Sequence, residues 1–203
     1  MTDRLTTLLR EVDEFLMGES RVQATLTRIA RCLDDLGIDF ALAGGLAVGM
    51  RGHLRLTVDV DILITADGLL RFKARWLGRG YVERLPESKS VRDTETGVSI
   101  DFLVAGEFPG DGRPKPVRFP DPCTIVRTEE ACRVLDLRTL VELKLASGIS
   151  APDRLQDLAD IVALVRANDL AEAFGERLDP SVREKYRELW LAAQRPTEPE
   201  QRG

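Results

Sequence analysis

The chain has 203 residues, of which 43% are hydrophobic and 31% charged, as is typical of a soluble globular protein. No apolar run approaches the ~20 residues that span a bilayer, and the N-terminus lacks the apolar core of a signal peptide, so we expect a cytoplasmic protein with no membrane contact. The net charge of −5 argues against a protein that coats nucleic acid by bulk electrostatic attraction.

Cysteine and histidine usage narrows the chemistry further. The three cysteines are odd in number and form no C-x-x-C pair, which predicts free thiols in a reducing compartment. His53 is the only histidine, and this argues against a zinc site and against a hydrolase with a histidine base.

The N-terminal third predicts two helices followed by a short strand and a glycine turn. Apolar residues recur every three or four positions over residues 4–36, with a break near Gly18. A strand is expected over residues 38–43. The pair Gly44 and Gly45 ends it, and the following LAVGMRG begins a short helix.

Residues 55–64, RLTVDVDILI, predict a strand built from β-branched and aliphatic residues. Side chains two positions apart in a strand share a face at about 7 Å, so Asp59 and Asp61 point the same way. In the same alternation, Arg55 and Thr57 share that face.

The rest of the chain predicts a second alternating strand, a long loop and several helices. GVSIDFLVA, residues 97–105, carries Asp101 on its less apolar face. The segment 106–122 is dense in Gly and Pro and predicts a long loop, either a lid over a site or a connector. The remaining expected elements are a helix over 65–77, a strand at YVERL, and helices over 137–147, 152–167 and onward to Ala193.

This order predicts an α+β fold: a small mixed β-sheet flanked by helices, with a helical C-terminal part. The expected parts are N-terminal helices packed on the core over 1–36, an α/β core over 37–135, a helical part over 136–194 and a disordered tail over 195–203.

Three carboxylates give this fold its candidate chemistry. Asp59 and Asp61 repel each other by roughly 2–4 kcal/mol at an effective dielectric near 20, which an arginine or a divalent cation would relieve. Carboxylate oxygens favour Mg²⁺ or Mn²⁺ over zinc. If the two alternating strands are neighbours, Asp101 completes a set of three carboxylates, the arrangement that nucleotidyl transfer requires. The alternative is an acidic pair of purely structural origin.

Two stretches carry a resemblance to a known family. AGGLAVGMRGHLRLTVDVDILI resembles the motif of the nucleotidyltransferase superfamily, with the DNA polymerase β-like fold, in which Gly-Gly precedes Asp-x-Asp and a third acid follows on a later strand. LVELKLASGISAPDRLQDLADIVALV resembles the AbiEii/AbiGii-type toxin branch, although Gln156 stands where relatives often carry a basic residue. The resemblance covers residues 38–64, 98–104 and 140–165.

The resemblance implies a metal-dependent enzyme that moves an NMP from an NTP to an acceptor. Asp59, Asp61 and Asp101 would be catalytic and would bind Mg²⁺ or Mn²⁺. The nucleotide-binding residues would be Gly44, Gly45, Arg55, Thr57, Lys144 and Asp157. The acceptor stays open between RNA such as a tRNA, a protein and a small molecule. The resemblance is also compatible with a toxin or defence role, an antitoxin partner and a homo-oligomer.

Competing interpretations stay open at the same positions. The chain could be a catalytically silent nucleotide-binding or interaction module, or a helical protein that dimerises through its N-terminal helices. Lys144 either contacts a phosphate, with Asp157 orienting it, or pairs with Asp157 as a structural ion pair. The acidic stripe Asp153, Asp157 and Asp160 is also what the solvated face of an amphipathic helix looks like.

Overall fold

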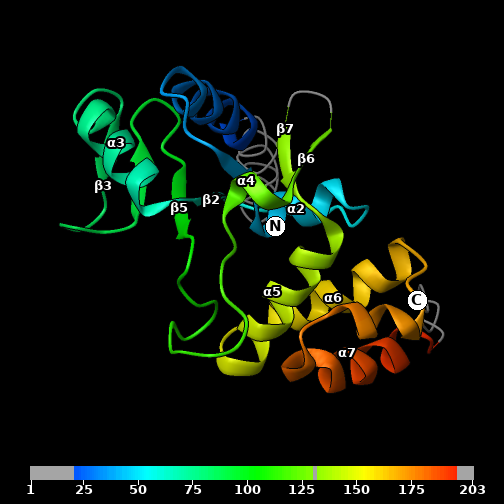
Figure 1. The fold of residues 1–203 in the computed structure, drawn as a ribbon. Coiled ribbons are helices and arrows are strands. Elements are labelled where there is room, and N and C mark those ends of the chain that lie inside the picture. The colour runs from blue at the N-terminus through cyan, green and yellow to red at the C-terminus, as the bar shows by residue number, and fades with distance from the viewer. Residues whose placement is uncertain (1–20, 130–131, 196–203) are drawn as a thin grey trace, which may run out of the picture. The chain divides into compact units, whose positions relative to one another are not determined.

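The computed structural model describes residues 21–129 and 132–195. The chain divides into two units (Figure 1). The first comprises the described residues up to Ala47, together with Arg55–Ala105 and Pro120–Leu135. The second comprises Val48–Leu54, Gly106–Phe119 and the described residues from Asp136 onward.

A mixed sheet forms the centre of the first unit. Within the described residues it has seven strands in the order β3-β4-β5-β2-β1-β7-β6. The strands are β1 (Phe40–Leu42), β2 (Asp59–Ile64), β3 (Tyr81–Glu83), β4 (Ser90–Asp93), β5 (Ser99–Val104), β6 (Val126–Glu129) and β7 (Cys132–Leu135). The β2–β5 and β1–β7 pairs are parallel, and the other pairs are antiparallel.

Helices of the first unit pack on this sheet. Residues 21–35 are helical, and the labelled helices are α2 (Gly44–Met50), α3 (Ala66–Trp76) and α4 (Pro122–Ile125). The Thr65 hydroxyl caps α3 by accepting a hydrogen bond from the Gly68 amide at 3.0 Å. Phe72 of α3 is fully buried, and its ring lies 5.2 Å from the rings of both Tyr81 and Phe102. The edge-to-face contact with Tyr81 and the tilted contact with Phe102 fix α3 against β3 and β5.

Alternation along β2 and β5 decides which face of the sheet is apolar. The buried residues at alternate positions are Val60, Ile62 and Ile64 of β2 and Ile100, Phe102 and Val104 of β5. Each such side chain contributes about 1.5–3 kcal/mol by leaving water. This burial fixes the register of both strands, because a shift by one residue would move all six of these side chains to the face of the aspartates. The opposite positions therefore turn the aspartates toward the other face.

The second unit is helical, with α5 (Leu137–Ser150), α6 (Leu155–Ala167), the 3₁₀ helix η1 (Glu172–Arg177) and α7 (Pro180–Ala193). The helices α5, α6 and α7 all pack on one another (Figure 1). Asp136 caps α5 by accepting from the Thr139 amide at 3.1 Å, and Asp179 caps α7 by accepting from the Ser181 amide at 2.9 Å. None of the helices in the described residues is both long and apolar enough to cross a bilayer.

The expected α+β fold, with a mixed sheet and a helical C-terminal part, is confirmed. The strand predicted over 55–64 is wrong at its start, because β2 begins at Asp59, and the strand predicted over 38–43 covers only Phe40–Leu42. The strands β4, β6 and β7 and the short helix α4 were not expected from the sequence. The first predicted N-terminal helix and most of the predicted tail lie outside the described residues.

Candidate active site

The three aspartates lie on two neighbouring strands of the first unit. The strands β2 and β5 pair in parallel, with Asp61 opposite Asp101 and Asp59 opposite Ser99. Paired residues on adjacent strands point to the same face, so Asp61 and Asp101 stand side by side. Asp59 lies two positions before Asp61 on that same face. The sheet therefore places the three predicted carboxylates on one face, with Asp61 and Asp101 side by side and Asp59 next to Asp61 along β2. We call these three residues the carboxylate row.

Gly44 lies directly against this row. The strand β1 ends at Leu42, the Ala43 amide donates to the Asp61 carbonyl at 2.9 Å, and α2 begins at Gly44. Gly44 has φ +57°, and a Cβ at this position would overlap the Asp61 carboxylate. Only glycine gives both this backbone conformation and this close approach.

Gly45 lies against two further predicted residues. A Cβ on Gly45 would be 3.0 Å from Thr57 Oγ1 and 3.1 Å from Arg55 Nη2. The Thr57 hydroxyl donates to Asp59 Oδ1 at 2.9 Å. Although residues 55–58 are not part of β2, they bring the Arg55 and Thr57 side chains to the glycine turn. The guanidinium supplies positive charge beside a backbone that has no side chain to block a ligand.

Ser90 is a site residue that sequence reasoning missed. It is the register partner of Asp101 on β4, and its hydroxyl donates a hydrogen bond to Asp101 Oδ1. The only sequence signal was the four-residue stretch SVRD, which is too short to predict a strand or the residues with which it pairs.

The donor set suits a hard divalent cation. Three carboxylates on one face supply the oxygen ligands that Mg²⁺ and Mn²⁺ prefer. Over residues 21–129 and 132–195, no three His, Cys, Asp or Glu side chains are already gathered as a metal-binding group. The hydroxyls of Thr57 and Ser90 hold the Asp59 and Asp101 carboxylates at their sides of the row. The chemical type of the three carboxylates and their register on the sheet thus fit the ion. Their side chains, however, are not gathered around one point.

The remaining predicted residues, Lys144 and Asp157, belong to the second unit. Lys144 Nζ lies 2.7 Å from Asp157 Oδ1 and 2.7 Å from Asp160 Oδ2. The Ser147 hydroxyl donates to Asp157 at 2.6 Å, and the Gln156 amide donates to Asp160 at 3.0 Å. Lys144 and Asp160 are buried. The ion pair between Lys144 and Asp157, one of the two interpretations left open by the sequence, is therefore present, and it joins α5 to α6.

The solvated-face interpretation of α6 is wrong for its central acids. Asp160 is fully buried, and the Asp157 side chain is only 15% exposed. Asp160 can be buried because it pairs with Lys144, a cation on the neighbouring helix α5. The residue pattern of α6 alone gives no sign of this partner. Gln156, at the position often basic in relatives, supplies the amide that donates to Asp160.

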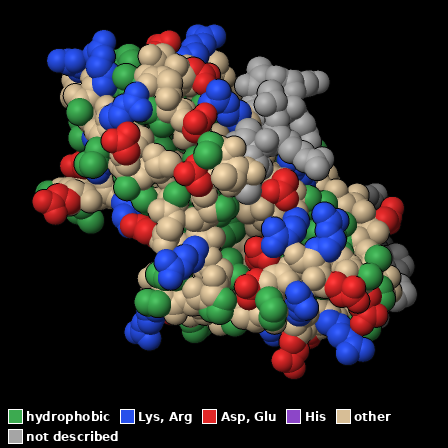
Figure 2. Space-filling view, in the orientation of Figure 1, with side chains coloured by type: hydrophobic (Ala, Val, Ile, Leu, Met, Phe, Trp, Pro, Cys, Tyr) green, Lys and Arg blue, Asp and Glu red, His purple; other side chains and the backbone are tan. Residues whose placement is uncertain are grey.

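Basic residues of α3 are engaged within the first unit. Arg71 lies 3.7 Å from Asp67, Lys73 lies 2.7 Å from Glu83, and the Arg75 guanidinium lies over the Trp76 ring. On the face shown in Figure 2, Lys and Arg side chains lie among Asp and Glu side chains. These three basic residues thus have the contacts typical of a solvated helix surface whose charges pair within the protein.

Cys32 and Cys123 are free thiols, as expected. Burial raises the pKa of the Cys32 thiol, and a hydrogen bond with Asp121 raises the pKa of the Cys123 thiol. Neither has the lowered pKa that activates a cysteine nucleophile.

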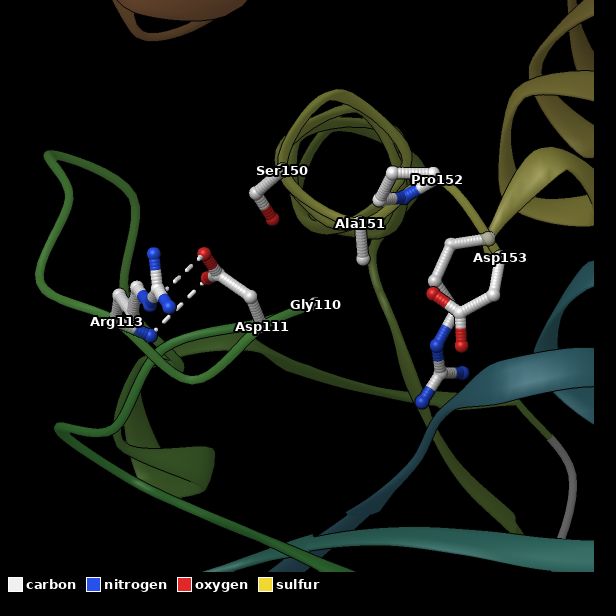
Figure 3. A pocket seen from close by; sticks show the side chains of 8 residues that line it. Gly110, Asp111, Arg113, Ser150, Ala151, Pro152 and Asp153 are labelled. Atoms are coloured by element: carbon white, nitrogen blue, oxygen red, sulfur yellow. Dashed lines mark hydrogen bonds and ion pairs between the residues drawn. The ribbon is translucent and has the colours of Figure 1, made fainter.

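The long loop is anchored to α5 within the second unit and lines a pocket of about 410 Å³ (Figure 3). Lys115 Nζ donates to Asp111 Oδ1 at 2.5 Å and to Ser150 Oγ at 2.9 Å. Gly110, with φ +72°, lies so close that a Cβ there would be 2.8 Å from the Ser147 carbonyl oxygen. Gly110, Asp111 and Arg113 of the predicted loop therefore form one wall of this pocket.

Comparison with known proteins identifies the fold. No protein-family model and no curated protein sequence matches the chain. Among solved structures, the crystal structure of ANT(2″)-Ia in complex with adenylyl-2″-tobramycin superposes with a TM-score of 0.52 at 14% identity, covering 82% of this chain and 97% of that one. The fold is a nucleotidyltransferase fold.

Two further structures match with lower TM-scores at 16% identity. The solution structure of the antibiotic-resistance factor ANT(2″)-Ia gives 0.47 and covers 84% of this chain and 90% of that one. An antigenic nucleotidyltransferase-like protein from Paracoccidioides brasiliensis gives 0.44 and covers 72% and 76%. The assignment of the nucleotidyltransferase fold rests on the first comparison together with the sheet described above.

Proposed function

We propose that the protein is a metal-dependent nucleotidyltransferase that moves an NMP from an NTP to a hydroxyl of a separate acceptor. The observation that carries this proposal is the register of β2 and β5, which sets Asp61 beside Asp101 while the Gly44 backbone lies against Asp61. A structural acidic pair would need neither a third carboxylate in register nor a glycine whose missing side chain leaves room for it.

Each residue has a role that follows from its position. Gly44 and Gly45 let the triphosphate approach the backbone, and Arg55 beside Gly45 balances phosphate charge. Asp59 and Asp61 would hold the metal ion together with Asp101. Asp101 would also accept the proton of the acceptor hydroxyl as its oxygen bonds to the α-phosphorus and pyrophosphate leaves.

The ion supplies a defined share of this chemistry. When bound, Mg²⁺ lowers the pKa of the attacking hydroxyl and stabilises charge on the leaving pyrophosphate. The protein's own contribution is to fix the carboxylates on two strands of one sheet, since positioning and electrostatics account for most of catalysis in phosphoryl transfer.

Charge favours a protein or a small molecule over RNA as the acceptor. The net charge is −5, and the basic residues of α3 that could attract a polyanion already have partners within their own unit. The toxin-like role implied by residues 140–165 belongs to the same proposal. It predicts that expression of the chain slows growth and that the Asp61→Asn substitution relieves the effect.

The test is transfer of label from the α-phosphate of an NTP. The chain is incubated with Mn²⁺ or Mg²⁺, each NTP labelled at the α- or the γ-phosphate, and a tRNA mixture, cell protein or an aminoglycoside. We expect one acceptor fraction to take up α-label but no γ-label. Asp61→Asn should abolish transfer while the circular dichroism spectrum stays unchanged, and Asp67→Asn, on exposed α3, serves as the matched control and should retain it.

Two outcomes would contradict the proposal. Thermal stabilisation by an NTP with metal, but no labelled product with any acceptor, would favour the catalytically silent nucleotide-binding module. Absence of both stabilisation and transfer would favour an interaction protein that has only the fold.

A further inference from the structure

Each outer carboxylate of the row is held by a neutral hydroxyl. Thr57 Oγ1 donates to Asp59 Oδ1 at 2.9 Å, and Ser90 Oγ donates to Asp101 Oδ1. The Thr57 contact is local in sequence. The Ser90 contact crosses from β4 to β5, so it depends on the pairing of two strands.

Ser90 is itself fixed at the start of β4. Its amide donates to Ser88 Oγ at 3.0 Å, and its register partner is Asp101. Asp101 has Asp61 as its register partner on the other side. The order across the face is therefore hydroxyl, carboxylate, carboxylate, with the Gly44 backbone against the last.

We propose that Ser90 is a positioning residue for Asp101, an inference that rests on the proposed nucleotidyl transfer. The hydrogen bond to Oδ1 fixes the rotamer of Asp101 beside its like-charged neighbour Asp61. It leaves Oδ2 as the oxygen that binds the ion or accepts the hydroxyl proton. A carboxylate already held in place loses less side-chain freedom when it binds its ligand.

The experiment compares Ser90→Ala with wild type in Mn²⁺ titrations and steady-state transfer assays. Loss of a group that orients a metal ligand lowers metal affinity or activity by about 10- to 100-fold, and we expect such a fall in Mn²⁺ affinity and in kcat. The KM for the NTP should change by less than about threefold, because the glycine turn and Arg55 are untouched. Ser90→Thr, which keeps the hydroxyl and suits a strand, should restore both quantities.

The matched control is Thr94→Ala. Thr94 follows the opposite end of β4, and its hydroxyl donates to the Gly80 carbonyl at 3.1 Å. This variant loses a comparable hydrogen bond from the same strand region and should keep the Mn²⁺ affinity of wild type. If Ser90→Ala fails to fold, Ser90→Cys, of similar size and a weaker donor, takes its place with the same expectation.

The outcomes separate the two proposals. A wild-type chain that binds Mn²⁺ and transfers NMP, with Ser90→Ala or Ser90→Cys indistinguishable from it, overturns the role of Ser90 alone. Equal losses in Ser90→Ala and Ser90→Thr also overturn it, because the effect would then follow packing and not the hydroxyl. A wild-type chain that neither binds Mn²⁺ nor transfers NMP overturns the proposed function and this role with it.

Discussion

The buried cation between α5 and α6 gives the sharpest test of what Lys144 does. The Lys144→Met substitution keeps a long, flexible side chain but removes an ammonium that contacts two carboxylates at 2.7 Å. The Lys144 side chain is 7% exposed, and that of Asp160 is fully buried. The substitution therefore leaves carboxylates without their cation in a place that water reaches poorly.

The expected loss follows from these contacts. Each ion pair is worth roughly 6 kcal/mol of gross Coulomb energy at an effective dielectric of 20, most of which offsets desolvation. Removing one partner from a buried pair costs about 3–5 kcal/mol. For a chain of this size, about 2–4 °C per kcal/mol corresponds to a melting temperature roughly 6–20 °C lower.

Urea and thermal denaturation at pH 7 measure this loss. The double variant Lys144→Met, Asp160→Asn removes the stranded charge and should regain a substantial part of the stability. Lys185→Met is the surface control, because Lys185 pairs with the exposed Glu188 three residues later on α7 and such pairs contribute about 0–1 kcal/mol. A Lys144→Met variant with nearly wild-type stability but at least tenfold weaker NTP binding would refute the structural role and favour phosphate contact.

Two further variants test the second unit. Gly110→Ala should cost about 2–4 kcal/mol and Gly112→Ala about 1 kcal/mol in urea denaturation, because both have φ near +70° but only the Gly110 position faces a carbonyl, that of Ser147. Equal losses would contradict the close loop contact. Burial raises the pKa of Tyr186 to about 12, against about 10 in the unfolded chain. The contribution of Tyr186 to the free energy of unfolding is therefore fully present below pH 10, and about 2–3 kcal/mol of it is lost as the pH rises towards 12. Tyr186→Phe should lack the part of the alkaline fall that Tyr186 contributes and keep the part from Tyr81, whose pKa is also raised by burial. An alkaline profile equal to that of wild type would contradict the assignment.

Local pattern was sufficient for the elements whose burial repeats along the chain. Val60, Ile62 and Ile64 of β2 recur at every second position, as do Ile100, Phe102 and Val104 of β5, so both strands and the face of their aspartates followed from the sequence. The glycine turn after β1 was also visible, because Gly-Gly between a strand and a helix has few other uses.

The missed elements depend on partners far along the chain. The strand β7 has four residues and joins the sheet through the Leu42–Val134 pair, which no local window contains. Residues 55–58 show the opposite error. They have strand composition, but β5 begins only at Ser99, the register partner of Asp59, so residues 55–58 have no residue of β5 opposite them. Strand propensity alone does not make a strand without a neighbour to pair with.

Two groups of acidic residues, Asp157 with Asp160 and Asp59 with Asp101, differ in the hydrogen-bond and ion-pair partners that the structure shows for them. Asp157 and Asp160 surround a buried lysine, so their charge is compensated by the protein itself. The Asp59 and Asp101 carboxylates each accept a hydrogen bond from a hydroxyl, which orients a carboxylate without adding charge. Under the proposed function, this orientation would suit a cation that arrives with a substrate. If Asp59→Asn and Asp101→Asn both left Mn²⁺ binding unchanged while Asp160→Asn removed it, this distinction would be reversed.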